Sequence, residues 1–158
     1  DISGLDYITI SEDELPFSDT AEGEEKYRED QVRRILSSKI INLSGMSNTD
    51  IKLTYGTANF PELSKYDQNY LLLIRNLGMW GSYLHHNCDG QDERARQILE
   101  RAIELGSDIR DTYVSLAEIY LDAGQPEKVQ ELIHHVEKSD FDLKDSLLRS
   151  LKNLLNTL

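Results

Sequence analysis

The segment Asp111–Phe141, which reads DTYVSLAEIYLDAGQPEKVQELIHHVEKSDF, decides the fold. Gly124 and Pro126 divide it into two halves, because glycine suits the end of a helix and proline the first turn of the next. In each half, apolar residues recur at three- and four-residue spacing, as on one face of an α-helix. The two runs are Tyr113, Leu116, Ala117 and Tyr120, then Val129, Leu132, Ile133 and Val136. Such a hairpin cannot bury both faces alone, so similar neighbours are expected.

A second copy of this pattern lies upstream. Leu77, Trp80, Gly81 and Leu84 precede Ala95, Leu99 and Ala102. The spacing from Ala95 to Val129 is 34 residues, and that from Leu77 to Tyr113 is 36, so two extra residues are expected in the turn around His86–Gly90. Gly81 is expected to let the next helix approach closely where Trp80 packs.

The two copies resemble the tetratricopeptide repeat (TPR), whose pattern is W-x₂-L-G-x₂-Y, then A-x₃-F and a late proline, over about 34 residues. The resemblance covers about Tyr70–Phe141. Ala117 replaces the pattern's glycine, Val129 its alanine, and Phe141 stands where the late proline would be. These are volume changes at packing positions. The resemblance implies an all-α fold, a right-handed superhelical stack of antiparallel helix hairpins with about six helices.

The expected organisation has two parts. Residues 1–21 form an acidic, partly ordered leader, extended and solvated or docked on a basic partner, and residues 22–158 form a single TPR-like domain. Its repeat units are about 70–106 and 107–141, closed by a capping helix at 142–158. Little strand is expected, and the helices are expected near residues 22–44, 62–87, 92–105, 109–123, 126–138 and 142–157.

Local signals refine these boundaries. Pro61 with the Ser64-x-x-Asp67 pair indicates the start of the second helix, and Ser107 or Asp108 is expected to cap the fourth. Met46–Phe60 is less clear, because Ile51, Leu53 and Tyr55 alternate as in a strand but have no partner strand. A long loop packed on the helices is the favoured interpretation.

The C-terminal tail carries a leucine seam that suits a closing helix. Leu148 and Leu155 widen this seam beyond what one partner helix would cover, which indicates a homodimer contact or a junction with further repeats. The seam itself is formed by Leu143, Leu147, Leu151, Leu154 and Leu158.

Charge limits the partners. Residues 1–30 contain eleven acids against two bases, a net of −9 within the total of −12, and the other 128 residues contain 18 acids and 15 bases. A nucleic-acid partner is not expected, because no basic stripe exists.

Cys88 is the only cysteine, so no intrachain disulfide can form. The longest apolar run, Tyr70–Ile74, is too short to span a bilayer.

The compartment stays open. The chain begins with Asp1 rather than Met, so we expect a processed product or a fragment of a larger protein. A cytoplasmic protein and the soluble part of an exported or membrane-anchored protein are both consistent with the sequence.

Catalytic and metal signals are sparse. His85, His86, Cys88 and Asp89 lie in one turn, but adjacent histidines on a helix point about 100° apart. Zinc sites of cysteine and histidine normally show two spaced pairs. The same objection applies to His134-His135. No metal site is therefore expected. The sequence also lacks a nucleophile elbow, a phosphate loop and a pair of catalytic carboxylates, so no cofactor and no catalytic residue is expected.

The expected function is non-catalytic: a protein–protein interaction module or scaffold that binds a peptide or protein segment on its helical surface. The alternative is an accessory domain of an enzyme or membrane-anchored protein whose active groups lie elsewhere. The repeat pattern places exposed positions of the first helix of each unit on a concave inner face. These candidate partner-binding residues are Arg75, Gly78, Ser82, His85, Asp111, Val114, Ser115, Glu118 and Asp122. The carboxylates favour a basic or amide-rich partner.

Overall fold

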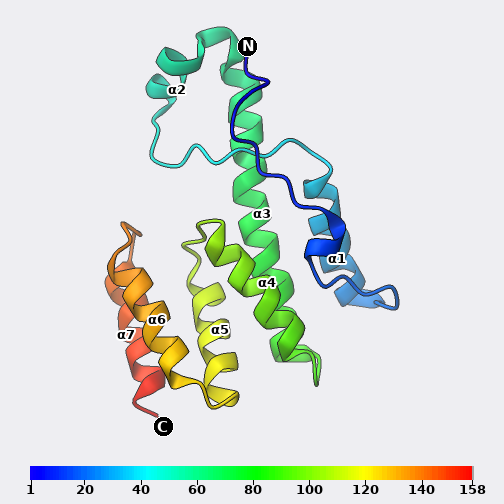
Figure 1. Ribbon diagram of the computed structural model, residues 1–158, viewed down its shortest axis with the longest axis vertical. Coiled ribbons are helices and arrows are strands. Elements are labelled where there is room, and N and C mark those ends of the chain that lie inside the picture. Colours follow the sequence, from blue (N-terminus) through cyan, green and yellow to red (C-terminus); the bar gives the residue numbers. More distant parts are fainter. Residues whose placement is uncertain (158) are drawn as a thin grey trace. The chain divides into compact units, whose positions relative to one another are not determined.

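The computed structural model describes residues 1–157, which contain helices and connecting segments but no strand (Figure 1). The expectation of an all-α protein is confirmed. The described residues form seven α-helices and two short 3₁₀ turns, Glu12–Glu14 before the first helix and Thr57–Asn59 between the second and the third. The helices are α1 (Gly23–Leu36), α2 (Asn48–Tyr55), α3 (Phe60–Asn87), α4 (Asp92–Glu104), α5 (Arg110–Asp122), α6 (Pro126–Glu137) and α7 (Lys144–Leu155).

The chain divides into two compact units, Asp1–Asn76 and Leu77–Leu158, with the boundary inside α3. In the first unit, the N-terminal segment packs as part of the fold. Ile10 and Leu15 are buried, and Ile8 N donates to Ile40 O at 2.8 Å. Up to residue 21 the segment contains the 3₁₀ turn and two further turns, at residues 3–4 and 19–20, joined by irregular backbone.

The first helix is shorter than predicted. It ends at Leu36 rather than near residue 44, and Ile40, Ile41 and Leu43 are buried from an irregular segment instead. Ile41 N donates to Tyr66 O at 3.2 Å, and Leu43 N donates to Asp67 Oδ1 at 3.0 Å. These bonds to α3 satisfy the backbone that a longer helix would have satisfied internally.

The prediction of a loop over Met46–Phe60 is wrong for its central part, because α2 occupies it. Ser47 accepts from Asp50 N at 3.1 Å and Asp50 accepts from Ser47 N at 2.9 Å, a reciprocal capping box. Ile51 is buried in a cluster with Ile41, Leu43 and Leu63, whereas Leu53 is 80% exposed. The alternation of Ile51, Leu53 and Tyr55 therefore does not mark a strand: Ile51 and Tyr55, one helical turn apart, face the cluster, and Leu53 faces solvent.

The start of α3 also differs. The helix begins at Phe60, so Ser64 lies inside it, and Asp67 serves the Leu43 backbone rather than a cap. The expectation that Ser107 or Asp108 caps α5 is wrong, because the residue before the helix is Ile109 and no side chain caps it. Ser107 Oγ instead accepts from Ile109 N at 3.2 Å in the turn that precedes the helix.

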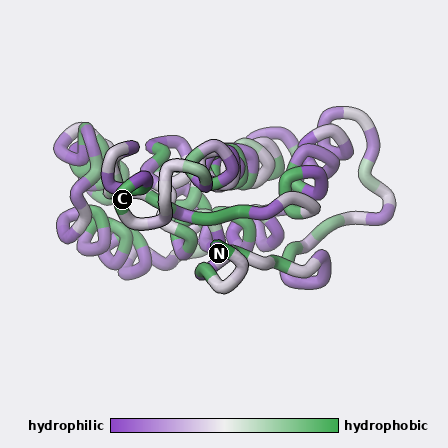
Figure 2. Tube along the Cα trace, turned by 90° about the horizontal axis from the view of Figure 1, so that it is seen from above, coloured by the Kyte–Doolittle hydropathy of each residue, from purple (hydrophilic) through white to green (hydrophobic). Residues whose placement is uncertain are grey.

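In the second unit, α4 packs on α5, and α5, α6 and α7 pack on one another (Figure 1). Hydrophobic and hydrophilic residues are interspersed along the coiled parts of the trace (Figure 2). Trp80 and Tyr113 have no exposed surface, which confirms them as core. A Cβ added at Gly81 would lie 2.7 Å from Leu99 side-chain atoms, so α4 does approach closely there.

The last helix carries the leucine seam only in part. Leu147 and Leu151 are buried, but Leu143 precedes the helix, is 84% exposed and has a left-handed backbone with φ 61°. Leu148 and Leu155 are half-buried, and Leu158 lies outside the described residues.

Candidate functional site

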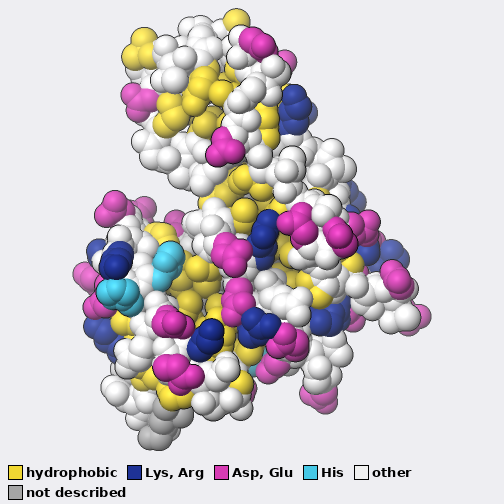
Figure 3. Space-filling model, viewed as in Figure 1, with side chains coloured by type: hydrophobic (Ala, Val, Ile, Leu, Met, Phe, Trp, Pro, Cys, Tyr) yellow, Lys and Arg dark blue, Asp and Glu magenta, His cyan; other side chains and the backbone are white. Residues whose placement is uncertain are grey.

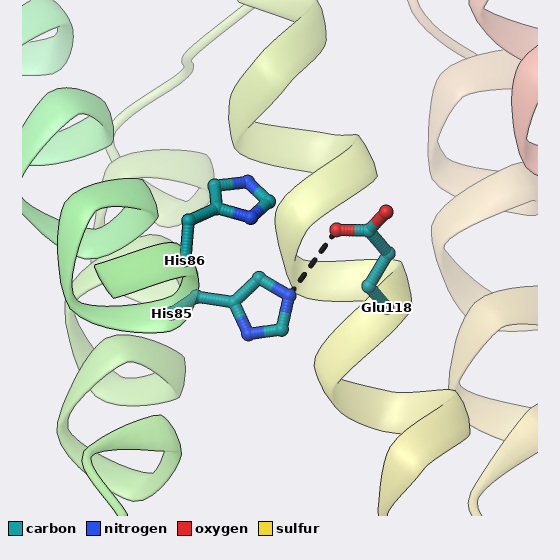
Figure 4. Close-up of side chains that lie close together, drawn as sticks. All are labelled: His85, His86 and Glu118. Atoms are coloured by element: carbon teal, nitrogen blue, oxygen red, sulfur yellow. Dashed lines mark hydrogen bonds and ion pairs between the residues drawn. The ribbon is translucent and has the colours of Figure 1, made fainter. Parts of the chain in front are cut away.

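The last turns of α3 meet α5 along a line of small and polar side chains. Gly78 lies against the Thr112 hydroxyl, and Ser82 Oγ and Ser115 Oγ are hydrogen bonded at 2.9 Å. One turn further, His85 Nε2 lies 3.2 Å from Glu118 Oε1 (Figure 4). Three predicted residues of α3 and two of α5 are thus brought together, through the contacts Ser82–Ser115 and His85–Glu118.

This arrangement changes the interpretation of the predicted inner face. Gly78 and Ser115 are buried, so the expectation that they are exposed is wrong: both help α3 and α5 to approach. Ser82, His85, Val114 and Glu118 are half-buried, whereas Asp111 and Asp122 are exposed. Arg75 is exposed in the first unit and is described only there.

His85 contacts carboxylates with both ring nitrogens. Its Nδ1 lies 2.9 Å from Asp92 Oδ1 at the start of α4, and its Nε2 faces Glu118. The side chain is only 10% exposed. Because a neutral imidazole carries one N–H, only one of these contacts can be an ordinary hydrogen bond without a second proton or another cation.

A groove of about 580 Å³ opens beside this pair, lined by α4, the end of α5 and the start of α6. Four carboxylates and two cations line it, so it is acidic. The charged lining residues are Asp92, Glu93, Glu100, Asp122, Arg96 and Lys128. Figure 3 shows acidic and basic side chains mixed over the face that α4 and α6 present.

Arg96 is held within the groove by its own helix. Its guanidinium bonds Glu93 one turn before it and Glu100 one turn after it, the latter at 2.7 Å. The Tyr120 hydroxyl donates to Glu100. Burial and the adjacent Glu100 carboxylate raise the pKa of Tyr120 above its ordinary value. Hydrogen bonds from Arg96 and then Gln97 lower the pKa of Glu93.

Two overlapping groups of potential metal ligands occur among the described residues. One is His85, His86 and Glu118, and the other is His85, Asp92 and Asp122. The ring centroids of His85 and His86 are 4.7 Å apart. The sequence argument against chelation assumed that adjacent rings diverge, yet here one ligand atom from each residue of a group lies within 4.8 Å of the others.

The sequence could not supply Glu118 to this group, because that residue comes from another helix. The TPR-like pattern does not point to this contact either, because the 36-residue spacing of its first helices pairs His85 with Leu121 and Glu118 with Ser82. His134 and His135 belong to no such group among residues 1–157.

A serine nucleophile is not available at this site. Ser115 Oγ lies 3.5 Å from His86 Nε2, but Ser115 is 2% exposed and its hydroxyl also meets Ser82. A substrate could not reach that oxygen.

No family model, curated protein or solved structure matches this chain. Within the part of the chain that the structure describes, no helix has both the length and the apolar character needed to cross a membrane.

Proposed function

We propose that residues 77–158 form a TPR-like stack that serves as a protein-interaction module, without catalytic activity of its own. The repeat spacing and the close approach of α4 at Gly81 support the stack. The contact of α5 with α7 also supports it, because in such stacks the first helices of successive units are neighbours.

The observation that carries the binding proposal is the charge of the α4–α5–α6 groove. Arg96 is already paired with Glu93 and Glu100, so its charge is compensated inside the groove. Asp92 and Asp122 then leave the rim acidic, with Lys128 as the remaining cation. The occupant that fits is a protein segment rich in lysine, arginine or side-chain amides, bound in a salt-dependent manner.

The same face keeps part of the predicted inner surface. Asp122 lines the groove, and Glu118 lies one turn earlier on α5. Glu118 faces His85 Nε2 at 3.2 Å and is half-buried, so we assign the partner contact to the exposed Asp122.

The test uses peptides selected from a random display library on the immobilised protein. We expect selected sequences enriched in basic or amide side chains, with affinity that falls as salt is raised to about 1 M. Asp122→Lys should weaken their binding about tenfold or more, because it places a cation against cationic peptides. Asp140→Lys is the matched control: it changes an exposed acid that does not line the groove. Equal binding of the wild type and Asp122→Lys would reject the groove as the site.

A further inference from the structure

Two adjacent histidines at the end of α3 face a carboxylate of α5. His85 and His86 come from its last turn, and Glu118 comes from the middle of α5 (Figure 4). Each offers one ligand atom within 4.8 Å of the other two. Two imidazoles and one carboxylate form the donor set that zinc takes at three-ligand protein sites, with a fourth position open to water.

The environment of His85 orients one nitrogen for a metal. In the neutral tautomer whose Nδ1–H donates to Asp92 Oδ1 at 2.9 Å, Nε2 has no proton and its lone pair faces Glu118 Oε1 at 3.2 Å. Two lone pairs at that distance repel unless a cation lies between them. Metal-bound histidines commonly donate their other N–H to a carboxylate in this way, which fixes the tautomer.

We propose that His85 Nε2, His86 and Glu118 bind a zinc-type divalent ion, with Asp92 as the carboxylate that orients His85. Tetrahedral zinc with bonds of about 2.0–2.1 Å holds its ligand atoms roughly 3.3 Å apart. His85 and Glu118 already have that separation. His86 is exposed at the end of the helix, and its inward movement would replace its 3.5 Å contact with Ser115 Oγ by a bond to the ion.

The competing group, His85 with Asp92 and Asp122, offers one nitrogen and two carboxylates. We favour the first group because a second imidazole suits zinc, whereas sites dominated by carboxylates suit harder cations. Asp122 is then not a ligand, and only its negative charge acts on the bound ion. The bound ion would join α3 to α5 and stabilise the folded state by mass action. This inference does not depend on the proposed peptide groove.

The test is zinc and cobalt titration of the full chain with any histidine tag removed. We expect ZnCl₂ to raise the melting temperature and CoCl₂ to give the visible absorption of a tetrahedral cobalt site. His86→Ala and Glu118→Gln should each lower zinc affinity more than about tenfold, and Asp92→Asn about ten- to a hundredfold. His86 is exposed, so the metal-free His86→Ala variant is expected to melt as the metal-free wild type does.

Two control variants make the assignment specific. His134→Ala alters an exposed histidine of the other adjacent pair and should leave zinc affinity unchanged. Asp122→Asn should also retain it. The proposal is overturned if zinc neither binds nor shifts the melt, or if His134→Ala lowers affinity as much as His86→Ala. It is also overturned if Asp122→Asn abolishes binding while His86→Ala does not, because the other ligand group would then hold the ion. Should either ligand variant fail to fold, the cobalt spectrum of the other decides.

Discussion

At the scale of single residues, Gly81 shows how closely this fold depends on one missing side chain. A Cβ built there would lie 2.7 Å from both Cγ and Cδ2 of Leu99 and 3.4 Å from the Ala95 carbonyl oxygen. Leu99 and Ala95 are themselves fully buried, so neither can retreat into solvent. The α3–α4 pair in the second unit is therefore set by glycine at this position.

Gly81→Ala should lower the free energy of unfolding by about 1–3 kcal/mol, because an added methyl in a filled core forces its neighbours to shift. Urea denaturation followed by circular dichroism measures the change. Gly4→Ala is the control, since no atom lies within 4 Å of a Cβ there and its φ is not in the left-handed region. A change at Gly81 as small as that at Gly4 would contradict the close approach.

The Tyr113 side chain is buried and also forms a hydrogen bond to the backbone. Its ring has no exposed surface, and its hydroxyl donates to Ser107 O at 2.7 Å, just before α5 begins. Tyr113→Phe keeps the ring but leaves that buried carbonyl with one fewer donor. We expect a loss of about 1–3 kcal/mol of stability, measured by chemical denaturation. Tyr27→Phe, at a 52% exposed position, is the control, and a loss of the same size there would reject the explanation.

At the scale of elements, α5 is the central helix of the second unit. Seven of its residues are buried, and it packs against α4, α6 and α7. Its sequence predicted this, because the apolar runs flanking Gly124 are regular and the turn residues are typical. Gly124 indeed has a left-handed φ of 70°, and Pro126 occupies the first turn of α6.

Elements of the first unit were harder to predict, for a physical reason. After α1 ends, Ile40 and Leu43 keep a helix-like spacing, yet their burial comes from an irregular segment bonded to Tyr66 and Asp67. The spacing of apolar residues indicates which side chains are buried. It does not show that the Leu43 backbone bonds to Asp67, 24 residues later in the sequence. The capping box of α2 was a local signal, Ser47 with Asp50, and it outweighed the short alternating run.

The contact between α4 and α5 should make stability depend on pH in the alkaline range. Tyr120 donates to Glu100, and burial and that carboxylate raise the pKa of Tyr120. The folded chain therefore keeps this proton at pH values where the unfolded chain loses it, so unfolding releases a proton. Stability is fully present below the ordinary tyrosine pKa of about 10 and falls as pH rises above it.

We expect the free energy of unfolding of the wild type to decrease more steeply above about pH 10 than that of Tyr120→Phe. Denaturant titrations at a series of alkaline pH values measure both slopes. Tyr27→Phe is again the matched control and should keep the wild-type slope. Parallel slopes for the wild type and Tyr120→Phe would show that this hydroxyl does not carry the dependence.

At the scale of the whole molecule, the uneven charge of the sequence belongs to a folded segment. Residues 1–30 carry a net charge of −9, which the sequence alone made compatible with a solvated leader. In the structure, Ile10 and Leu15 of this segment are buried. Two spaced apolar side chains among many acids give no periodic signal, so their burial could not be predicted. The histidine–carboxylate group was missed for a similar reason, since Glu118 reaches His85 only through the packing of α5.

Glu29 anchors this segment. It is fully buried on α1, and both its carboxylate oxygens face Ser18 N, at 3.2 and 3.1 Å. Arg33, one turn later, lies 3.5 Å from Oε1. A buried carboxylate persists only where donors and an opposite charge compensate its desolvation. The acidic segment therefore supplies a backbone donor that Glu29 needs, and Glu29 holds that segment against α1.

Glu29→Ala should leave Ser18 N without its carboxylate acceptor and should lower stability by about 1–3 kcal/mol. Amide hydrogen exchange should show residues 8–20 opening more often, while α6 and α7 keep their protection. Asp19→Ala is the matched control, because that neighbouring acid is exposed. Unchanged exchange of residues 8–20 in Glu29→Ala would mean that the apolar contacts of Ile10 and Leu15 hold the segment without the carboxylate. Equal loss of protection in both variants would point instead to the net charge of the segment, since each substitution removes one negative charge.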